Sequence, residues 1–333
     1  MYFNFCLFDE CFAIYKSNIK KFSKMFFLFI LLCLFKSPCF SQNNDIVLNS
    51  FSDVIFGLEK EKRASVGLAL SGGGARGFAH VGVIEVIRNS NMPIDYIAGT
   101  SMGAIVGAFY ALDYDMDSMW DFGKNISKYK ISKDFSSQKL IKIILTGKLS
   151  DPLYVRKFID NHFAKLKFSD LKIPFGCVAM DINSGEKIIF DKGDLSPAVK
   201  ASVNIPGIFS PLEYKSRYLV DGGVVDFLPV DVLKDFKAEW ILSSVTENKI
   251  YNSPKTVIET LMQVIDIRGN LISKKSEDES DFILKPDVSF IKAAEFDKSN
   301  EAALKAVPYT YNRLNSIKER YVKDNFLLII ERI

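Results

Sequence analysis

Residues 65–112 decide how this chain folds, and they read SVGLALSGGGARGFAHVGVIEVIRNSNMPIDYIAGTSMGAIVGAFYAL. Each half of this stretch begins with an apolar run of strand length, continues with glycines, and ends in an apolar segment of helix length. We therefore expect strands at 65–70 and 94–98, and helices at about 75–89 and 104–112. Strands that alternate with helices predict a parallel sheet.

The same alternation continues towards the C-terminus. Further strands are expected at 173–180, 186–190, 218–220, 240–245 and 282–284, with 186–190 pairing back through a turn at 183–185. Helices are expected at 115–129, 153–166, 195–202, 229–236, 254–273 and 299–323. The pattern predicts one α/β domain over residues 65–333, with a mostly parallel central sheet covered on both faces. Residues 42–64 are polar and are expected to form a linker.

Residues 1–41 differ from the rest of the chain. Lys20, Lys21 and Lys24 precede an apolar run at 25–35, and small residues follow where a signal peptidase cleaves. This layout predicts a secretory signal peptide with an N-terminal extension. A membrane anchor or a buried strand is the alternative, although the run is short for a membrane span. We expect export to the periplasm, the outer membrane or the medium.

Charge and cysteine content exclude several classes of protein. The chain carries a net charge of +3, and the lysines of residues 1–41 account for that excess. Global charge therefore gives no indication of nucleic-acid binding. Only Cys177 of the five cysteines lies outside residues 1–41, so neither a disulfide framework nor a cysteine-based metal site is expected.

The first motif is the glycine cluster at 71–77, SGGGARG, between a predicted strand and a predicted helix. Glycines let backbone amides approach a ligand closely, and the helix adds a positive dipole end, so the loop suits a phosphate or an oxyanion. Gly72, Gly74 and Gly77 also match a dinucleotide-binding signature. That signature expects an acidic residue at the end of the next strand, whereas Asp95 lies at its beginning.

The second motif is Gly99-Thr100-Ser101-Met102-Gly103, a G-x-S-x-G pattern between a strand and a helix. This context is that of a nucleophile elbow, in which flanking glycines permit a tight turn that presents the serine hydroxyl. Ser101 is therefore the candidate nucleophile, and the alternative is a serine that caps the following helix.

The base that such a serine needs is not an obvious histidine. His80 and His162 both fall in predicted helices, where a packing role is favoured. Asp221, in Val220-Asp221-Gly222-Gly223, follows a short strand and can accept the serine proton in a partly dehydrated site. A simple turn aspartate is the alternative, because Asp-Gly is a common turn pair.

Taken together, these motifs resemble the patatin-like phospholipase family, in its bacterial, secreted type. The stretches that carry the resemblance are 72–77, 99–103 and 221–223, supported by 171–175, 181–186 and 201–207. The similarity spans about residues 65–245, in the order in which the family has these elements.

The resemblance implies a three-layer α/β/α fold, lipid acyl hydrolase activity, and no metal or organic cofactor. It makes Ser101 the nucleophile, Asp221 the base, and Gly99 and Gly103 the glycines of the elbow. The oxyanion hole is assigned to Gly72, Gly73, Gly74 and Arg76, with amides around Gly73 and Gly74 as donors and Arg76 fixing the loop.

The predicted function is a serine phospholipase A or lysophospholipase that uses a Ser-Asp dyad and an acyl-enzyme. Its expected partners are phospholipids or other fatty-acyl esters, with transient contact to a membrane surface and no nucleic acid. Two alternatives stay open: a non-catalytic lipid-binding protein on the same fold, and an esterase or thioesterase that acts on other substrates.

Overall fold

A mixed sheet of eight strands lies at the centre of the computed structural model, which describes residues 44–125, 129–246, 254 and 257–332. The strands are β1 (Val66–Leu70), β2 (Tyr96–Thr100), β3 (Phe175–Asp181), β4 (Lys187–Phe190), β5 (Leu212–Tyr214), β6 (Arg217–Asp221), β7 (Trp240–Ser244) and β8 (Phe282–Leu284). They follow the order β5-β6-β3-β2-β1-β7-β8, and β4 also pairs with β3. Strands β3, β2, β1, β7 and β8 are mutually parallel, whereas β4, β5 and β6 pair antiparallel.

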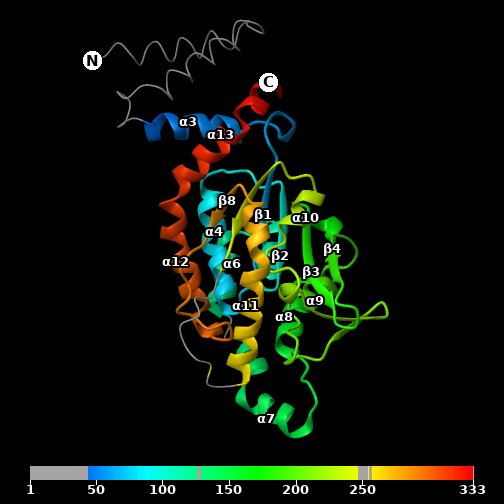
Figure 1. The fold of residues 1–333 in the computed structure, drawn as a ribbon. Helices are drawn as coiled ribbons and strands as arrows, with labels where there is room; N and C mark the ends of the chain where they lie inside the picture. The colour runs from blue at the N-terminus through cyan, green and yellow to red at the C-terminus, as the bar shows by residue number, and fades with distance from the viewer. Residues whose placement is uncertain (1–43, 126–128, 247–253, 255–256, 333) are drawn as a thin grey trace, which may run out of the picture.

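Helices cover both faces of this sheet, which gives the three-layer α/β/α arrangement that was expected (Figure 1). They are α3 (Asn44–Phe56), α4 (Ala79–Asn89), α5 (Met102–Ala111), α6 (Met116–Asn125), α7 (Ser137–Thr146), α8 (Leu153–Phe163), α9 (Leu195–Ser202), α10 (Val230–Asp235), α11 (Val257–Asp278), α12 (Ser299–Tyr311) and α13 (Leu314–Arg332). Short 3₁₀ turns lie at η3 (Gly74–Phe78), η4 (Ile131–Phe135) and η6 (Gly222–Val224). None of the described helices is both long and apolar enough to cross a membrane.

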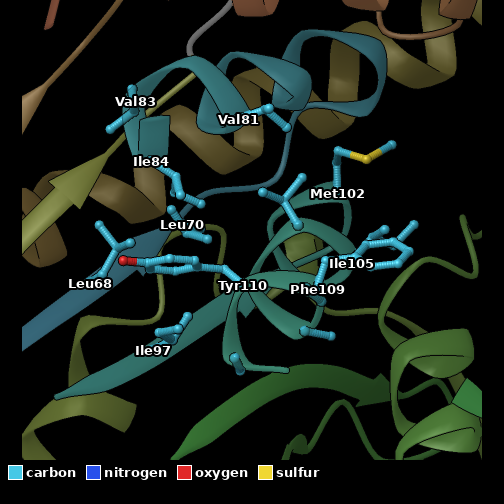
Figure 2. Packing of buried hydrophobic residues seen from close by; sticks show 14 of the residues in the cluster. Leu68, Leu70, Val81, Val83, Ile84, Ile97, Met102, Ile105, Phe109 and Tyr110 are labelled. Atoms are coloured by element: carbon cyan, nitrogen blue, oxygen red, sulfur yellow. The ribbon is translucent and has the colours of Figure 1, made fainter. Parts of the chain in front are cut away.

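Successive side chains along each strand point to opposite faces of the sheet, so the core has one part on each face. Leu68 and Leu70 of β1 pack into the larger apolar cluster, against α4 and α5, as Figure 2 shows. Ala69, between them, points to the opposite face, where it packs with Val232 and Leu233 of α10. Both faces of the strand are therefore buried, which explains why β1 reads as a continuous apolar run.

The C-terminal helix marks the end of the sheet at which the parallel strands begin. Arg332 of α13 donates a hydrogen bond to the carbonyl of Arg63, just before β1, and pairs with Glu239, just before β7. Figure 1 shows α3 and α13 together at this end and α7 at the other. The carboxyl ends of β1, β2 and β7 therefore face the end where α7 lies.

Most predicted elements are present, with several differences. The single helix expected at 299–323 is divided at residues 312–313 into α12 and α13. Strand β2 begins at Tyr96, two residues later than expected. The carboxylate of Asp95, just before it, accepts hydrogen bonds from Arg63 (2.6 Å) and from the Val66 amide (2.7 Å). Helix α7 and strand β5 were not predicted. Residues 44–56, within the expected linker, form helix α3, which buries Ile55 and packs on α13.

Candidate active site

The turn after β2 has the geometry of a nucleophile elbow. Ser101 has φ 56° and ψ −121°, a conformation that non-glycine residues rarely adopt. A β-carbon at Gly99 would lie 2.3 Å from the carbonyl oxygen of Gly103, and one at Gly103 would lie 2.3 Å from that of Leu70. Both positions therefore require glycine, and the turn holds the Ser101 side chain at the carboxyl end of the sheet.

The register of the sheet brings Ser101 beside Asp221. Thr100 of β2 pairs with Val178 of β3, and the next β3 residue, Ala179, pairs with Asp221 of β6. Ser101 and Asp221 therefore flank the same level of β3. The Ser101 Oγ donates a hydrogen bond of 2.7 Å to Oδ2 of Asp221.

The Asp221 carboxylate is buried and has no cationic partner among the residues that the structure describes. Its Oδ1 accepts a hydrogen bond of 2.8 Å from the Gly223 amide, and its own amide donates to the Asn204 carbonyl (2.9 Å). Burial raises the pKa of Asp221 from 3.8 to about 6, and the hydrogen bonds from Ser101 and Gly223 offset only part of that rise. Asp221 is thus ionised at neutral pH, yet it is a stronger base than an exposed carboxylate.

The glycine loop between β1 and α4 presents two backbone amides. Gly73 and Gly74 have φ values of 149° and 57°, and no described residue accepts a hydrogen bond from either amide. The Gly72 amide, in contrast, donates to the Phe227 carbonyl (3.0 Å). The Gly72 amide is therefore engaged within the protein, whereas the Gly73 and Gly74 amides remain available to a ligand.

Close packing joins the loop to the other two motifs. A β-carbon at Gly77 would lie 2.5 Å from Cβ of Met102, the residue after Ser101. On the other side, the Phe227 ring would lie 2.7 Å from a β-carbon at Gly72 and 3.5 Å from one at Gly223. The structure therefore brings together all three motifs that the sequence singled out.

Arg76 fixes the glycine loop by contacts with distant parts of the chain. Its fully buried guanidinium pairs with Asp266 of α11 (2.6 Å) and donates to the Ile291 carbonyl (3.3 Å). The Ala75 amide is also fixed, by the Ala293 carbonyl at 2.8 Å. These contacts fix the loop against α11 and against the segment around Ile291.

Neither histidine is placed to act as the base. His80 is completely buried, with Nδ1 2.8 Å from Ser244 Oγ and Nε2 2.9 Å from the Ser71 carbonyl. Burial lowers the pKa of His80 to about 4, so the ring is neutral and occupied at both nitrogens. His162 bonds the Phe158 carbonyl (2.9 Å) within α8 and lies in an aromatic cluster.

Two further polar residues, Ser202 and Asn204, hold the backbone around Ser101 and Asp221. Ser202, at the end of α9, is fully buried and accepts a hydrogen bond of 3.0 Å from the Ser101 amide. The Asn204 side chain donates to the carbonyls of Ser210 (2.9 Å) and Leu219 (3.1 Å), which fixes the strand that carries Asp221. Both lie within 201–207, a stretch that contributed to the resemblance but whose contacts the sequence did not reveal.

Apolar side chains of the helices that follow the Ser101 turn differ in burial. Phe109 and Tyr110 belong to the core, whereas Ile144 and Leu145 are exposed. A small apolar cluster follows Asn204 in the sequence. It consists of Ile205, Ile208 and Phe209, packed with Phe135, Leu261, Met262 and Ile265. Two cavities, of about 430 and 310 Å³, lie elsewhere: neither is lined by Ser101 or Asp221.

Comparison with known proteins identifies relatives of this chain. An uncharacterized NTE family protein of Mycobacterium bovis is 35% identical over 175 residues, which cover 52% of this chain and 47% of that protein. Lysophospholipase NTE1 of Debaryomyces hansenii is 33% identical over 182 residues, which cover 54% of this chain and 12% of that protein. The chain thus spans about half the length of the mycobacterial relative and about an eighth of the yeast one.

Solved structures and a family model give further similarities. VipD from Legionella pneumophila has a TM-score of 0.48 at 12% identity, covering 78% of this chain and 67% of that one. Human GIVD cytosolic phospholipase A2 has a TM-score of 0.46 at 9% identity, covering 87% and 64%. The family model for the patatin-like phospholipase matches residues 68–234, which include the glycine loop, the elbow and Asp221. The chain belongs to the patatin-like phospholipase family.

Proposed function

We propose that this protein is a serine lipid acyl hydrolase of the phospholipase A or lysophospholipase type, with Ser101 as nucleophile and Asp221 as base. The observation that carries the proposal is the 2.7 Å hydrogen bond from Ser101 Oγ to Asp221 Oδ2. Both histidines are engaged elsewhere, so the carboxylate is the base within reach.

In the first step, Ser101 Oγ attacks the acyl carbonyl carbon while its proton passes to Asp221 Oδ2. The pKa of about 6 leaves Asp221 ionised at neutral pH and raises its affinity for that proton. The Ser101 amide is held by Ser202, which keeps the strained turn in place during the attack. The alcohol leaves with the proton from Asp221, and an ester of Ser101 remains.

The carbonyl oxygen becomes an oxyanion during this attack. The amides of Gly73 and Gly74 have no acceptor among the described residues, and they suit this role. One donor of this kind typically contributes about 3 kcal/mol to the transition state. In the second step Asp221 removes a proton from water, water attacks the acyl-enzyme, and the fatty acid departs as Ser101 recovers its proton.

The proposed partners are phospholipids or related fatty-acyl esters. The family and the lysophospholipase named among the relatives support this substrate class. The expected signal peptide lies in residues 1–41, outside the described structure, so the proposed export to the envelope or the medium is supported by the sequence layout.

Covalent labelling tests the proposal directly. A fluorophosphonate should label Ser101, as peptide mass spectrometry of the modified protein can establish, and Ser101→Ala should abolish both labelling and release of fatty acid from lysophospholipid. Ser184→Ala and Asp191→Asn, at exposed positions, are matched controls that should keep both properties. A folded Ser101→Ala protein that still hydrolyses the ester would refute the assignment, and an unlabelled wild type would favour the non-catalytic alternative.

A further inference from the structure

Helix α7 carries Leu145, the most exposed of the large hydrophobic side chains in the described part of the chain. Leu145 is 80% exposed, and Ile141 and Ile144 are 55% and 67% exposed. Helical spacing places these three residues on one face, called here the α7 apolar face. Helix α7 projects beyond the sheet at the end opposite α13 (Figure 1).

Lysines and no acidic residues accompany this face. Residues 137–149 contain Lys139, Lys142 and Lys148, and neither aspartate nor glutamate. Lys139 pairs with the buried Asp134, whereas Lys142 and Lys148 are exposed and form no ion pair with any described residue. A short helix with protruding aliphatic side chains beside lysines is suited to the boundary between lipid headgroups and acyl chains.

The α7 apolar face is connected to the catalytic base through a short series of contacts. Lys139 and the amides of Tyr154 and Val155 share the Asp134 carboxylate, which fixes α7 to the start of α8. Between these helices, Ser150 pairs with the 208–210 segment through hydrogen bonds of 3.2 and 3.0 Å.

The 208–210 segment is close in sequence to a residue that contacts Asp221. It follows Asn204, whose carbonyl accepts the Asp221 amide at 2.9 Å. An external surface in contact with α7 would therefore lie next to the end of the molecule where Ser101 is presented.

We propose that the α7 apolar face, with Lys142 and Lys148, docks the protein on an anionic phospholipid surface and so presents the dyad to its substrate. The inference rests on the proposed function for the identity of the substrate. A lipid surface fits better than a protein partner, because stable protein interfaces bury roughly 800 Å² per partner and are depleted in lysine. Three aliphatic side chains are only a small part of such an area.

Vesicle binding by the inactive Ser101→Ala protein measures docking without hydrolysis. Binding to vesicles of phosphatidylcholine with phosphatidylglycerol should exceed binding to phosphatidylcholine alone. Leu145→Glu should weaken binding to anionic vesicles by about tenfold, and Lys148→Ala by about fivefold. Leu327→Glu is the matched control, because Leu327 is 70% exposed on α13 at the other end of the molecule and should have no effect.

A fluorescent side chain at position 145 reports whether α7 itself contacts lipid, independently of any contact made by the N-terminal residues. The emission of Leu145→Trp should shift to the blue on anionic vesicles and be quenched by brominated phospholipid, whereas Leu327→Trp should respond to neither. Unquenched Leu145→Trp, or vesicle binding by Leu145→Glu at the wild-type level, would overturn the inference. A wild-type dimer that Leu145→Glu converts to a monomer in light scattering would assign the face to a second copy instead.

Failure of this inference is distinguishable from failure of the proposed function. Hydrolysis of a short, soluble ester does not require docking, so Leu145→Glu should retain it within about twofold while losing activity on anionic vesicles. Soluble-ester hydrolysis that persists in Ser101→Ala would refute the dyad, whatever the vesicles show.

Discussion

Replacing Asp221 by asparagine should inactivate the protein and stabilise its fold at neutral pH. The native carboxyl has a pKa of about 6, raised from 3.8 by burial. In the pH window between these values the folded state binds a proton that the unfolded chain releases. Wild-type stability therefore falls as pH rises through this window and levels off above it.

The size of the effect follows from the difference in pKa. About two pKa units correspond to about 3 kcal/mol at pH 8. Asparagine keeps an oxygen for the Gly223 amide and offers its own amide to Ser101, so little hydrogen bonding is lost. We expect Asp221→Asn to gain about 1–3 kcal/mol at pH 8, which is a rise in Tm of about 2–6 °C, and to gain almost nothing at pH 4.

Thermal and urea unfolding between pH 4 and pH 8, together with an ester assay, test this expectation. Asp134→Asn is the contrasting control: its carboxylate accepts the Tyr154 and Val155 amides and pairs with Lys139, so the same change should destabilise the protein. A stability difference for Asp221→Asn that does not vary with pH, or a loss at pH 8 as large as that of Asp134→Asn, would refute the reasoning.

Four further predictions concern the same site and the export of the chain. The kcat/KM of wild type should rise with pH through about 6 and then level off, because only ionised Asp221 accepts the proton, and a fall through that range in a pH–rate profile would contradict its role. Ser202→Ala removes the acceptor of the Ser101 amide and should lower kcat about tenfold with little change in KM, whereas Ser202→Cys, which retains a weak acceptor, should recover part of the rate in steady-state kinetics. In Gly74→Ala the new β-carbon would lie 2.3 Å from the Ala293 carbonyl oxygen, so turnover should fall about a hundredfold and Tm should also drop; unchanged kcat and fluorophosphonate labelling in a folded variant would rule out an oxyanion role. Mass spectrometry of the exported protein should find its N-terminus near Gln42, and residues 1–41 intact in the cytosol would disprove cleavage.

Local sequence was sufficient to predict the elements whose signals lie in the chain itself. The apolar runs of β1 and β7 are strands because both of their faces are buried, and the glycines around Ser101 and at 72–74 mark turns that side chains cannot occupy. Helix α7 escaped prediction because it packs little and its apolar side chains remain exposed, so its pattern was not that of a core helix. Residues 44–56 lie in the expected linker, yet seven of these thirteen residues are apolar, and they form helix α3, which packs on α13.

For the candidate site, the sequence by itself determined which residue types stand at strand ends: a serine between glycines, an aspartate before two glycines, and a glycine-rich loop. Tertiary structure decided how they meet, because only the pairing of β2 and β6 to the same level of β3 places Ser101 within 2.7 Å of Asp221, 120 residues apart. Tertiary structure also decided which backbone amides of the glycine loop can donate to a ligand. The Gly72 amide donates to the Phe227 carbonyl, whereas the Gly73 and Gly74 amides have no acceptor among the described residues. The raised pKa of Asp221 likewise arises from burial, and burial is a property of the packed chain that no local motif contains.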